Sequence, residues 1–195
     1  QSLLDWTTPG TNTLIPTASP TYIAGQGWKG DGVGAYYDTG LAANAAGLNF
    51  KQDDASMSWA AFDNVQRIAD VGAASSAMAS GVGRTSSDLM AGRLASSSQK
   101  TTANANGQGM FCISKTDATH YTFYINGVPA AVVASGSTAL TANNFTILRV
   151  SGAFAPNTVR VGYYRIGKHV TDTQALDEYN AVRTATRAVD TSLLP

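Results

Sequence analysis

The chain has 195 residues, enough for one domain with a buried core. Charged residues make up 13% of it, about half the usual fraction. This disfavours a helical bundle, because such bundles carry Glu and Lys on their outer faces. Thirteen basic residues balance thirteen acidic ones and no Lys/Arg run occurs, which argues against nucleic acid and anionic membrane surfaces as partners.

Two further features bound the context of the chain. Its one cysteine, Cys112, cannot form an internal disulfide, and its apolar neighbours indicate a small buried thiol in a strand. No apolar run reaches membrane-spanning length. The chain begins at Gln1 without an initiator methionine, so we expect a processed product or a piece of a longer polypeptide.

The N-terminal segment, residues 1–20, holds three of the six prolines and many threonines, which predicts an extended conformation. Residues 21–195 form the predicted domain. Within it, Gly30-Asp31-Gly32 is a predicted tight turn, with Trp28 and the Tyr36-Tyr37 pair on its two arms.

Several short strands are expected in the middle of the chain. Residues 56–62 and 65–71 are predicted to pair across Asp63-Asn64, and further strands pass through 89–93 and 110–115. Residues 96–109 are polar and of low complexity, and read as a surface loop or a weak strand.

Residues 120–133, HYTFYINGVPAAVV, contain the clearest local element. Tyr121, Phe123 and Ile125 alternate with other residues, the period-two pattern of a strand with one buried face. Asn126-Gly127 follows and favours a type I′ turn, because both central residues of that turn need positive φ. The pattern predicts an antiparallel hairpin.

The chain ends with strands at 145–150 and 158–166 and then a helix. Thr171-x-x-Gln174 has the form of a capping box, and apolar residues recur at helical spacing after it, which predicts an amphipathic helix over 172–189. Many short strands with one late helix indicate an all-β fold, an antiparallel β-sandwich of the jelly-roll kind. An up-and-down barrel is the alternative.

Three segments, in order, resemble a known family. Gly27–Gly32 followed by Ala35–Asp38 resembles the opening strands of concanavalin A-like, laminin-G-like lectin domains. Phe123–Val128 is similar to their strand, Asn-Gly, strand signature, and Val161–Gly167 with the helix after it is similar to their closing elements. The likeness runs over residues 22–189 and implies a concanavalin A-like sandwich.

The variant with a terminal helix resembles in particular the lectin-like modules of bacteriophage and prophage structural proteins, such as tail fibres and spikes. This resemblance implies a virion or extracellular location. It also implies that the partners are host-surface carbohydrate or other virion proteins, and it leaves open a homo-oligomer formed through the parent protein.

The sequence contains few residue patterns that could form a catalytic site. Glycoside hydrolysis needs two carboxylates at a set separation, and the chain has one glutamate, Glu178, inside the predicted helix. A Ser-His-Asp triad would need His120 or His169 as its base, and no GxSxG motif occurs. We therefore expect no enzymatic activity, with a glycan hydrolase as the least favoured alternative.

The resemblance implies calcium as a possible cofactor, although no residue pattern in the sequence requires a cofactor. Calcium prefers clustered oxygen ligands, and no loop of the EF-hand type is present. Gly-Asp-Gly can fold without a metal, so calcium stays an open alternative with no assigned ligand. The available carboxylates are Asp31, Asp38, Asp53, Asp54 and Asp63.

Sugar binding would use aromatic rings that stack on a pyranose. Neighbouring residues of a strand point to opposite faces, so one ring of each strand pair faces outward. The ligand-binding candidates are Tyr36, Tyr124, Tyr163 and Trp59. The first hypothesis is a non-catalytic module that binds host glycan. The second is a purely structural virion decoration or tail-attachment domain that makes protein–protein contacts.

Overall fold

The computed structural model describes residues 14–67, 69–73, 79–150 and 158–195. One sheet contains β1 (Ile15–Thr17), β4 (Tyr36–Ala42), β6 (Val71–Gly72), β7 (Ala79–Val82), β8 (Leu89–Leu94), β9 (Lys100–Ala103) and β13 (Asn144–Ile147). The other contains β2 (Thr21–Ile23), β3 (Gly27–Lys29), β5 (Ala55–Ala61), β10 (Gly109–Lys115), β11 (His120–Ile125), β12 (Val128–Ala134) and β14 (Arg160–Gly167). The helix α1 (Asp172–Arg187) follows the last strand.

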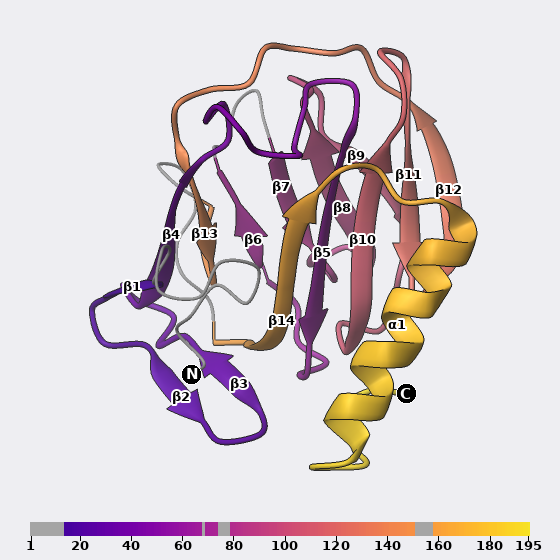
Figure 1. Ribbon diagram of the computed structural model, residues 1–195. Coiled ribbons are helices and arrows are strands. Elements are labelled where there is room, and N and C mark those ends of the chain that lie inside the picture. Colours follow the sequence, from indigo (N-terminus) through magenta and orange to yellow (C-terminus); the bar gives the residue numbers. More distant parts are fainter. Residues whose placement is uncertain (1–13, 68, 74–78, 151–157) are drawn as a thin grey trace.

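The two sheets lie face to face, and α1 packs against the outer face of the second sheet (Figure 1). In the described residues each sheet has seven strands, with the order β1-β4-β13-β6-β7-β8-β9 in the first. The order in the second is β12-β11-β10-β5-β14-β3-β2, and every pairing is antiparallel. The predicted all-β antiparallel sandwich with one C-terminal helix is confirmed.

The core lies between the sheets. Trp59 on β5 and Phe111 on β10 are fully buried, and their ring centroids are 5.7 Å apart. Phe50 and Phe145 meet edge to face at 5.0 Å, the geometry that aromatic quadrupoles favour. The core therefore forms from alternate strand residues, as expected for a sandwich.

The predicted hairpin is present as β11 and β12. Ile125 pairs with Val128, and Asn126 and Gly127 have φ angles of 52° and 76°. A Cβ at Gly127 would lie 2.8 Å from the Cα of Leu176 on α1. Glycine at this position thus serves both the turn and the approach of the helix.

The predicted pairing of residues 56–62 with residues 65–71 is wrong. β5 pairs with β10 and β14, whereas Val71 and Gly72 pair with β7 and β13 in the other sheet. Residues 63–67 therefore connect the sheets instead of closing a hairpin. Period-two patterning specifies which face of a strand is buried but not which strand lies beside it.

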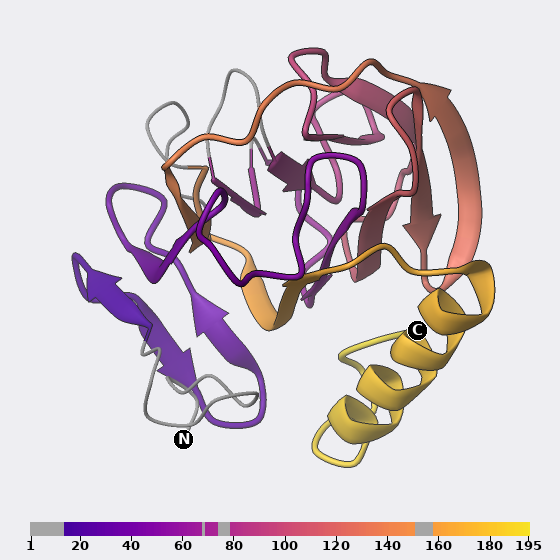
Figure 2. The same cartoon turned by 45° about the horizontal axis from the view of Figure 1, so that its top comes forward.

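The Gly-Asp-Gly turn is present, but its arms separate. Oδ1 of Asp31 accepts hydrogen bonds from the backbone N–H groups of Val33, Gly34 and Ala35 at 2.8–2.9 Å. Trp28 lies in β3 of the second sheet, and Tyr36 lies in β4 of the first (Figure 2). The turn therefore joins the two layers.

The capping box is confirmed at the start of α1. Oγ1 of Thr171 accepts from the N–H of Gln174, and the side chain of Gln174 accepts from the N–H of Thr171. The helix ends at Arg187, two residues before the predicted end at Val189. In the described residues no helix is both long enough and apolar enough to cross a membrane. Most of the predicted N-terminal segment 1–20 lies outside those residues.

Candidate functional site

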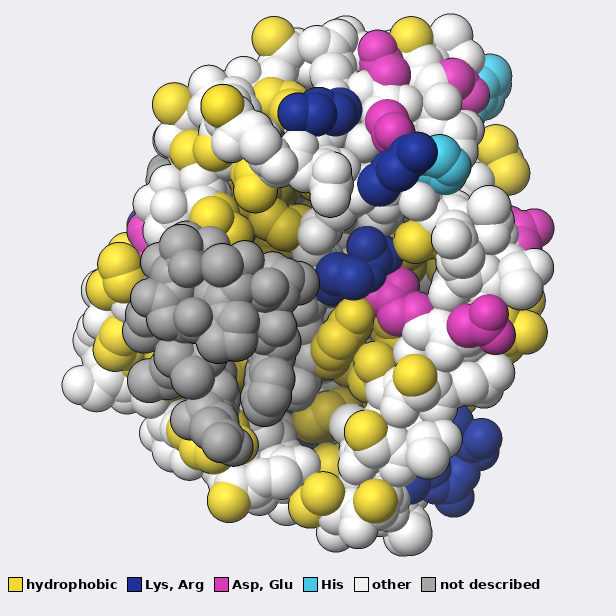
Figure 3. Space-filling view, in the orientation of Figure 1, with side chains coloured by type: hydrophobic (Ala, Val, Ile, Leu, Met, Phe, Trp, Pro, Cys, Tyr) yellow, Lys and Arg dark blue, Asp and Glu magenta, His cyan; other side chains and the backbone are white. Residues whose placement is uncertain are grey.

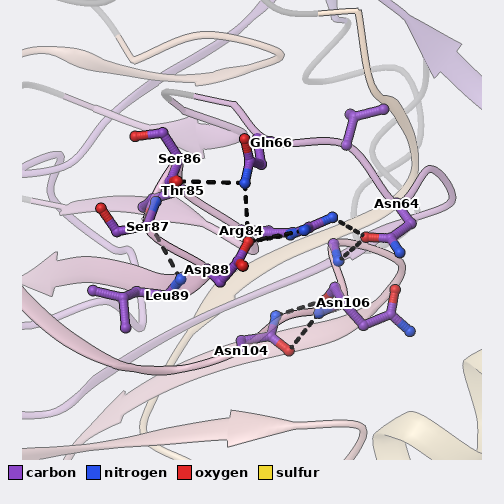
Figure 4. A network of polar contacts seen from close by, with 12 residues as sticks. Asn64, Gln66, Arg84, Thr85, Ser86, Ser87, Asp88, Leu89, Asn104 and Asn106 are labelled. Carbon is purple, nitrogen blue, oxygen red and sulfur yellow. Dashed lines mark hydrogen bonds and ion pairs between the residues drawn. The ribbon is translucent and has the colours of Figure 1, made fainter.

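Three loops meet at one end of the sandwich and carry a network of amide, guanidinium and carboxylate groups (Figure 4). The loops follow β5, join β7 to β8, and join β9 to β10. We call this network the loop cluster. Its members are Asn64, Gln66, Arg84, Asp88, Asn104 and Asn106.

A buried ion pair forms the floor of the loop cluster. The guanidinium of Arg67 contacts the carboxylate of Asp70 and also donates to the carbonyls of Val65 (2.7 Å) and Gly107 (2.9 Å). Asp70 further accepts from the backbone N–H of Gly83 at 2.8 Å. Because the buried charges are paired and hydrogen-bonded to loop backbone, they fix the loops from below.

Asn64 joins the three loops through one atom. Its Oδ1 accepts from Nη1 of Arg84 and from the N–H of Gly107, both at 2.8 Å. These contacts fix the orientation of the carboxamide. Its Nδ2 has no hydrogen-bond partner in the part of the chain that the structure describes, so two N–H donors are available to a ligand.

Asp88 supplies the carboxylate of the loop cluster. Its backbone is left-handed, with φ 55°, a conformation that non-glycine residues seldom adopt. Oδ1 accepts from Nε of Arg84 at 2.8 Å and from Nε2 of Gln66 at 3.0 Å. The hydrogen bonds from Gln66 and Arg84 lower the pKa of Asp88, so the group is ionised at neutral pH.

Asn104 and Asn106 shape the third loop. Nδ2 of Asn104 donates to the carbonyls of Gly83 (2.6 Å) and Asn106 (2.7 Å). Oδ1 of Asn106 accepts from the N–H of Gln108 at 3.1 Å. Among the described residues the Nδ2 of Asn106 has no partner, which leaves a second amide with two available donors.

The loop cluster therefore presents donors and acceptors in fixed positions. Nδ2 of Asn64 and of Asn106 can donate, while the second carboxylate oxygen of Asp88 and Oε1 of Gln66 can accept. A sugar hydroxyl both donates and accepts. Because the side chains are already held by protein contacts, little further ordering is needed when a ligand binds.

The charge of the loop cluster is balanced, since Arg84 and Asp88 form an ion pair at 2.8 Å. On the face shown in Figure 3, basic and acidic side chains lie close to each other in the upper and middle parts, and one group of basic side chains lies apart at the lower right. The paired charges of the loop cluster suit a neutral, hydroxyl-rich ligand better than a polyanion.

The four aromatic residues predicted to bind ligand do not come together. Trp59 is fully buried between the sheets and Tyr124 is only 3% exposed, so the expectation that either presents its ring to solvent is wrong. Tyr124 and Tyr163 do lie on the outer face of the second sheet, but α1 covers that face. Their hydroxyls donate to Asp172 and Glu178 of the helix, each at 2.8 Å.

Tyr36 is half-buried on β4, and the guanidinium carbon of Arg149 lies 4.7 Å from the centre of its ring. This contact is a cation–π interaction. The ring belongs to the first sheet, and in the described residues no hydrogen bond or ring contact joins it to the loop cluster.

The carboxylates considered for calcium are engaged elsewhere. Asp63 pairs with Arg160 at 2.7 Å, and Asp54 accepts from the N–H and from Nδ1 of His169 at 3.0 and 2.6 Å. Asp38 accepts from Asn144 at 3.0 Å. Within the described ranges no three His, Cys, Asp or Glu side chains gather in a way that could hold a metal ion.

Sequence reasoning missed the loop cluster. Its members come from three segments around residues 64, 84 and 106, and residues 96–109 read only as a polar loop. The sequence feature that could have indicated the loop cluster is the spacing of its amides. Asn64-x-Gln66 and Asn104-x-Asn106 place two carboxamides on each of two loops. No local rule shows that these loops meet.

Comparison with known proteins supports the architecture. The chain matches no family model and no curated protein. Among solved structures it is similar to the receptor-binding domain of the botulinum neurotoxin C/D mosaic serotype (TM-score 0.66, 9% identity, 87% of this chain, 46% of that one). It is also similar to a botulinum neurotoxin type C structure, from a toxin that depends on interaction with two ganglioside molecules for entering cells (0.61, 12%, 88% and 46%).

A third similar structure is Trypanosoma rangeli sialidase in complex with 2,3-difluoro-KDN (TM-score 0.63, 12% identity, 93% of this chain, 32% of that one). These identities establish the fold alone. The chain has a β-sandwich like those found in these binding proteins and in this sialidase, and it spans less than half the length of each.

Proposed function

We propose that the chain is a non-catalytic carbohydrate-binding module and that the loop cluster holds its ligand. The proposal rests on groups that are held in place but have no partner of their own in the described residues: the amide donors of Asn64 and Asn106 and one carboxylate oxygen of Asp88. The similar sandwich of a neurotoxin receptor-binding domain, and the ganglioside dependence stated for neurotoxin type C, support a module that binds cell surfaces.

The arrangement of carboxylates supports a binding role over hydrolysis. A glycosidase acts with two carboxylates on either side of the scissile bond. Glu178 is held against the sheet by Arg165 and Tyr163, and Asp88 is the one carboxylate in the loop cluster. Asp63, nearby in sequence, is paired with Arg160. We therefore assign no catalytic residue.

The setting that we propose is a bacteriophage or prophage structural protein that recognises a glycan on the host surface, outside the cell. This part of the proposal is supported by the sequence resemblance over residues 22–189. We further propose a neutral glycan, because the ion pair of Arg84 and Asp88 leaves the loop cluster without net charge.

A glycan array followed by calorimetry with the strongest hit tests the proposal. The decisive variant is Asn64→Asp combined with Asn106→Asp, because each new carboxylate keeps the Oδ1 acceptor but loses the free amide donors. Each lost hydrogen bond contributes about 1 kcal/mol, so we expect affinity to fall about tenfold or more with the unfolding temperature nearly unchanged.

Asn180→Asp makes the same change at an exposed position of α1 and is the matched control, with affinity expected to equal that of the wild type. An array without binding above background would contradict carbohydrate binding and favour the structural virion alternative. Binding that is lost in Tyr36→Ala but kept in the double variant would show that the ligand lies on the aromatic ring and not in the loop cluster.

A further inference from the structure

The contact between α1 and the second sheet differs from the core between the sheets. Ala175 is the one helix residue that is fully buried. Beneath the helix lie two small clusters apart from the inter-sheet core: Cys112 and Tyr124 meet Ala175 in one. Tyr179 and Val182 of the helix pack against the other, which contains Phe62 and Met110 of the sheet side. The large inter-sheet core contains no residue of α1, so it does not depend on the helix for its packing.

One polar contact holds the middle of the helix. The carboxylate of Glu178 accepts two hydrogen bonds from Arg165, at 2.7 Å from Nε and 3.0 Å from Nη2. It also accepts from the hydroxyl of Tyr163 at 2.8 Å and from Ser58 at 3.2 Å. Arg165 is 28% exposed and Glu178 is 12% exposed, so water borders this contact and can replace its hydrogen bonds.

A second polar contact holds the first turn, where the hydroxyl of Tyr124 donates to Asp172 at 2.8 Å. After the helix, Leu193 and Leu194 are buried beside Phe62 and Met110. The side chain of Gln108 also donates to the carbonyls of Ser192 and Leu193. The helix and the residues after it are thus attached to the outer face by a few polar contacts and two small apolar clusters.

The connection before the helix is attached differently. Oγ of Ser114 donates to the carbonyl of Val170 at 3.0 Å and accepts from its N–H at 2.9 Å. Ser56 donates to the carbonyl of Lys168, and Asp54 accepts from the N–H of His169. None of these hydrogen bonds involves a residue of α1, so they can hold the connection in place when the helix moves.

We propose that α1 and residues 188–195 form a cover that opens as one unit, with the backbone turning after the fixed residues 168–170, while the two sheets stay paired. Opening exposes Tyr124, Tyr163 and Arg165, a surface of two aromatic rings and a guanidinium. In the closed form these three side chains donate hydrogen bonds to the carboxylates of Asp172 and Glu178. Elements held by small clusters outside the main core can open locally without unfolding the rest.

Cys112 provides a probe for the test, because it is buried under the cover and is the one cysteine of the chain. Burial raises the pKa of its thiol to about 12, so a thiol reagent reacts with it only after the cover opens. We would measure the labelling rate of the full chain against urea concentration, beside unfolding followed by tryptophan fluorescence.

We expect labelling below the unfolding transition, with a weaker urea dependence than that of global unfolding, because opening exposes less surface. Glu178→Gln should raise the labelling rate about tenfold, while Asp177→Asn, an exposed neighbour, should leave it unchanged. Tyr124→Phe is a second variant and should raise the rate severalfold.

Labelling that follows global unfolding in rate and in urea dependence would overturn the proposal. So would equal rates for the wild type, Glu178→Gln and Tyr124→Phe, since the helix would then not be held by the contacts named here. Glycan affinity at the loop cluster is a separate measurement, and its outcome decides only the proposed function.

Discussion

The indole N–H of Trp59 donates a 2.8 Å hydrogen bond to Oδ2 of Asp70, and both side chains are fully buried. The same carboxylate contacts the guanidinium of Arg67, which holds the loops above it. The centre of the hydrophobic core and the floor of the loop cluster thus share one carboxylate.

Asp70→Asn is therefore expected to destabilise the fold strongly. The variant leaves the buried charge of Arg67 without its counter-ion, which costs about 3–5 kcal/mol of unfolding free energy. Urea unfolding followed by tryptophan fluorescence measures the change. Asp177→Asn, an exposed carboxylate on α1, is the control and should shift the free energy by less than about 0.5 kcal/mol. A loss below about 1 kcal/mol for Asp70→Asn would contradict the role assigned to this pair.

Two glycines should respond oppositely to the same substitution. A Cβ at Gly81 would lie 2.3 Å from Cη2 of Trp59, so Gly81→Ala overpacks the core and should cost about 1–3 kcal/mol. A Cβ at Gly136 would meet no atom within 4 Å, so Gly136→Ala should be neutral or stabilise by up to about 1 kcal/mol. Thermal unfolding of the two variants compares them, and equal midpoints would show that the core around Trp59 can adapt.

Acid should destabilise the protein partly through two exposed turns. Backbone N–H groups of Ala35, Gly34 and Val33 lower the pKa of Asp31 to about 2. Hydrogen bonds from the side chain and backbone of Thr119 and from the backbone of His120 lower the pKa of Asp117 to about 2. Because both values lie below the unfolded value of 3.8, the stabilisation is complete above that pH and is lost as the pH falls toward about 2.

Thermal midpoints measured between pH 5 and pH 2 test this dependence. The double variant Asp31→Asn, Asp117→Asn should lose less of its thermal midpoint over this range than the wild type, because neither new side chain titrates. Parallel curves for the two proteins would show that other carboxylates account for the acid sensitivity.

The capping box should contribute measurably to stability. Thr171→Ala removes the side-chain acceptor for the N–H of Gln174, and loss of such a cap costs about 1 kcal/mol. Thr173→Ala, two residues into the helix and exposed, is the matched control and should be close to neutral. A smaller effect at Thr171 than at Thr173, measured by urea unfolding, would contradict the assignment of Thr171 as the cap.

The local elements were predictable because their chemistry is local. Asn126-Gly127 favours its turn through backbone preferences of those two residues, and Thr171 with Gln174 satisfies the first N–H groups of the helix. The strand partners were harder to predict. Asp63-Asn64 has the composition of a turn, but Asn64 instead accepts hydrogen bonds from Arg84 and Gly107, which are distant in sequence.

The candidate site was not predictable for the same reason. Its loops meet because three strand ends lie at one end of the sandwich. This arrangement follows from the order of strands in the sheets, which cannot be predicted from any single segment of the sequence. The aromatic candidates were misjudged because alternation places Tyr124 and Tyr163 on an outer face but does not show that α1 covers that face.

The position of β14 has a consequence for synthesis on the ribosome. β14, residues 160–167, lies between β5 and β3, and residues 56–61 of β5 pair with it. One edge of β5, a strand that is buried along its full length, has no partner until β14, the last strand of the described chain, has been made. An unpaired apolar edge invites association with other chains. We therefore expect nascent chains stalled before residue 160 to aggregate or to recruit chaperones, and chains released after residue 167 to remain in solution.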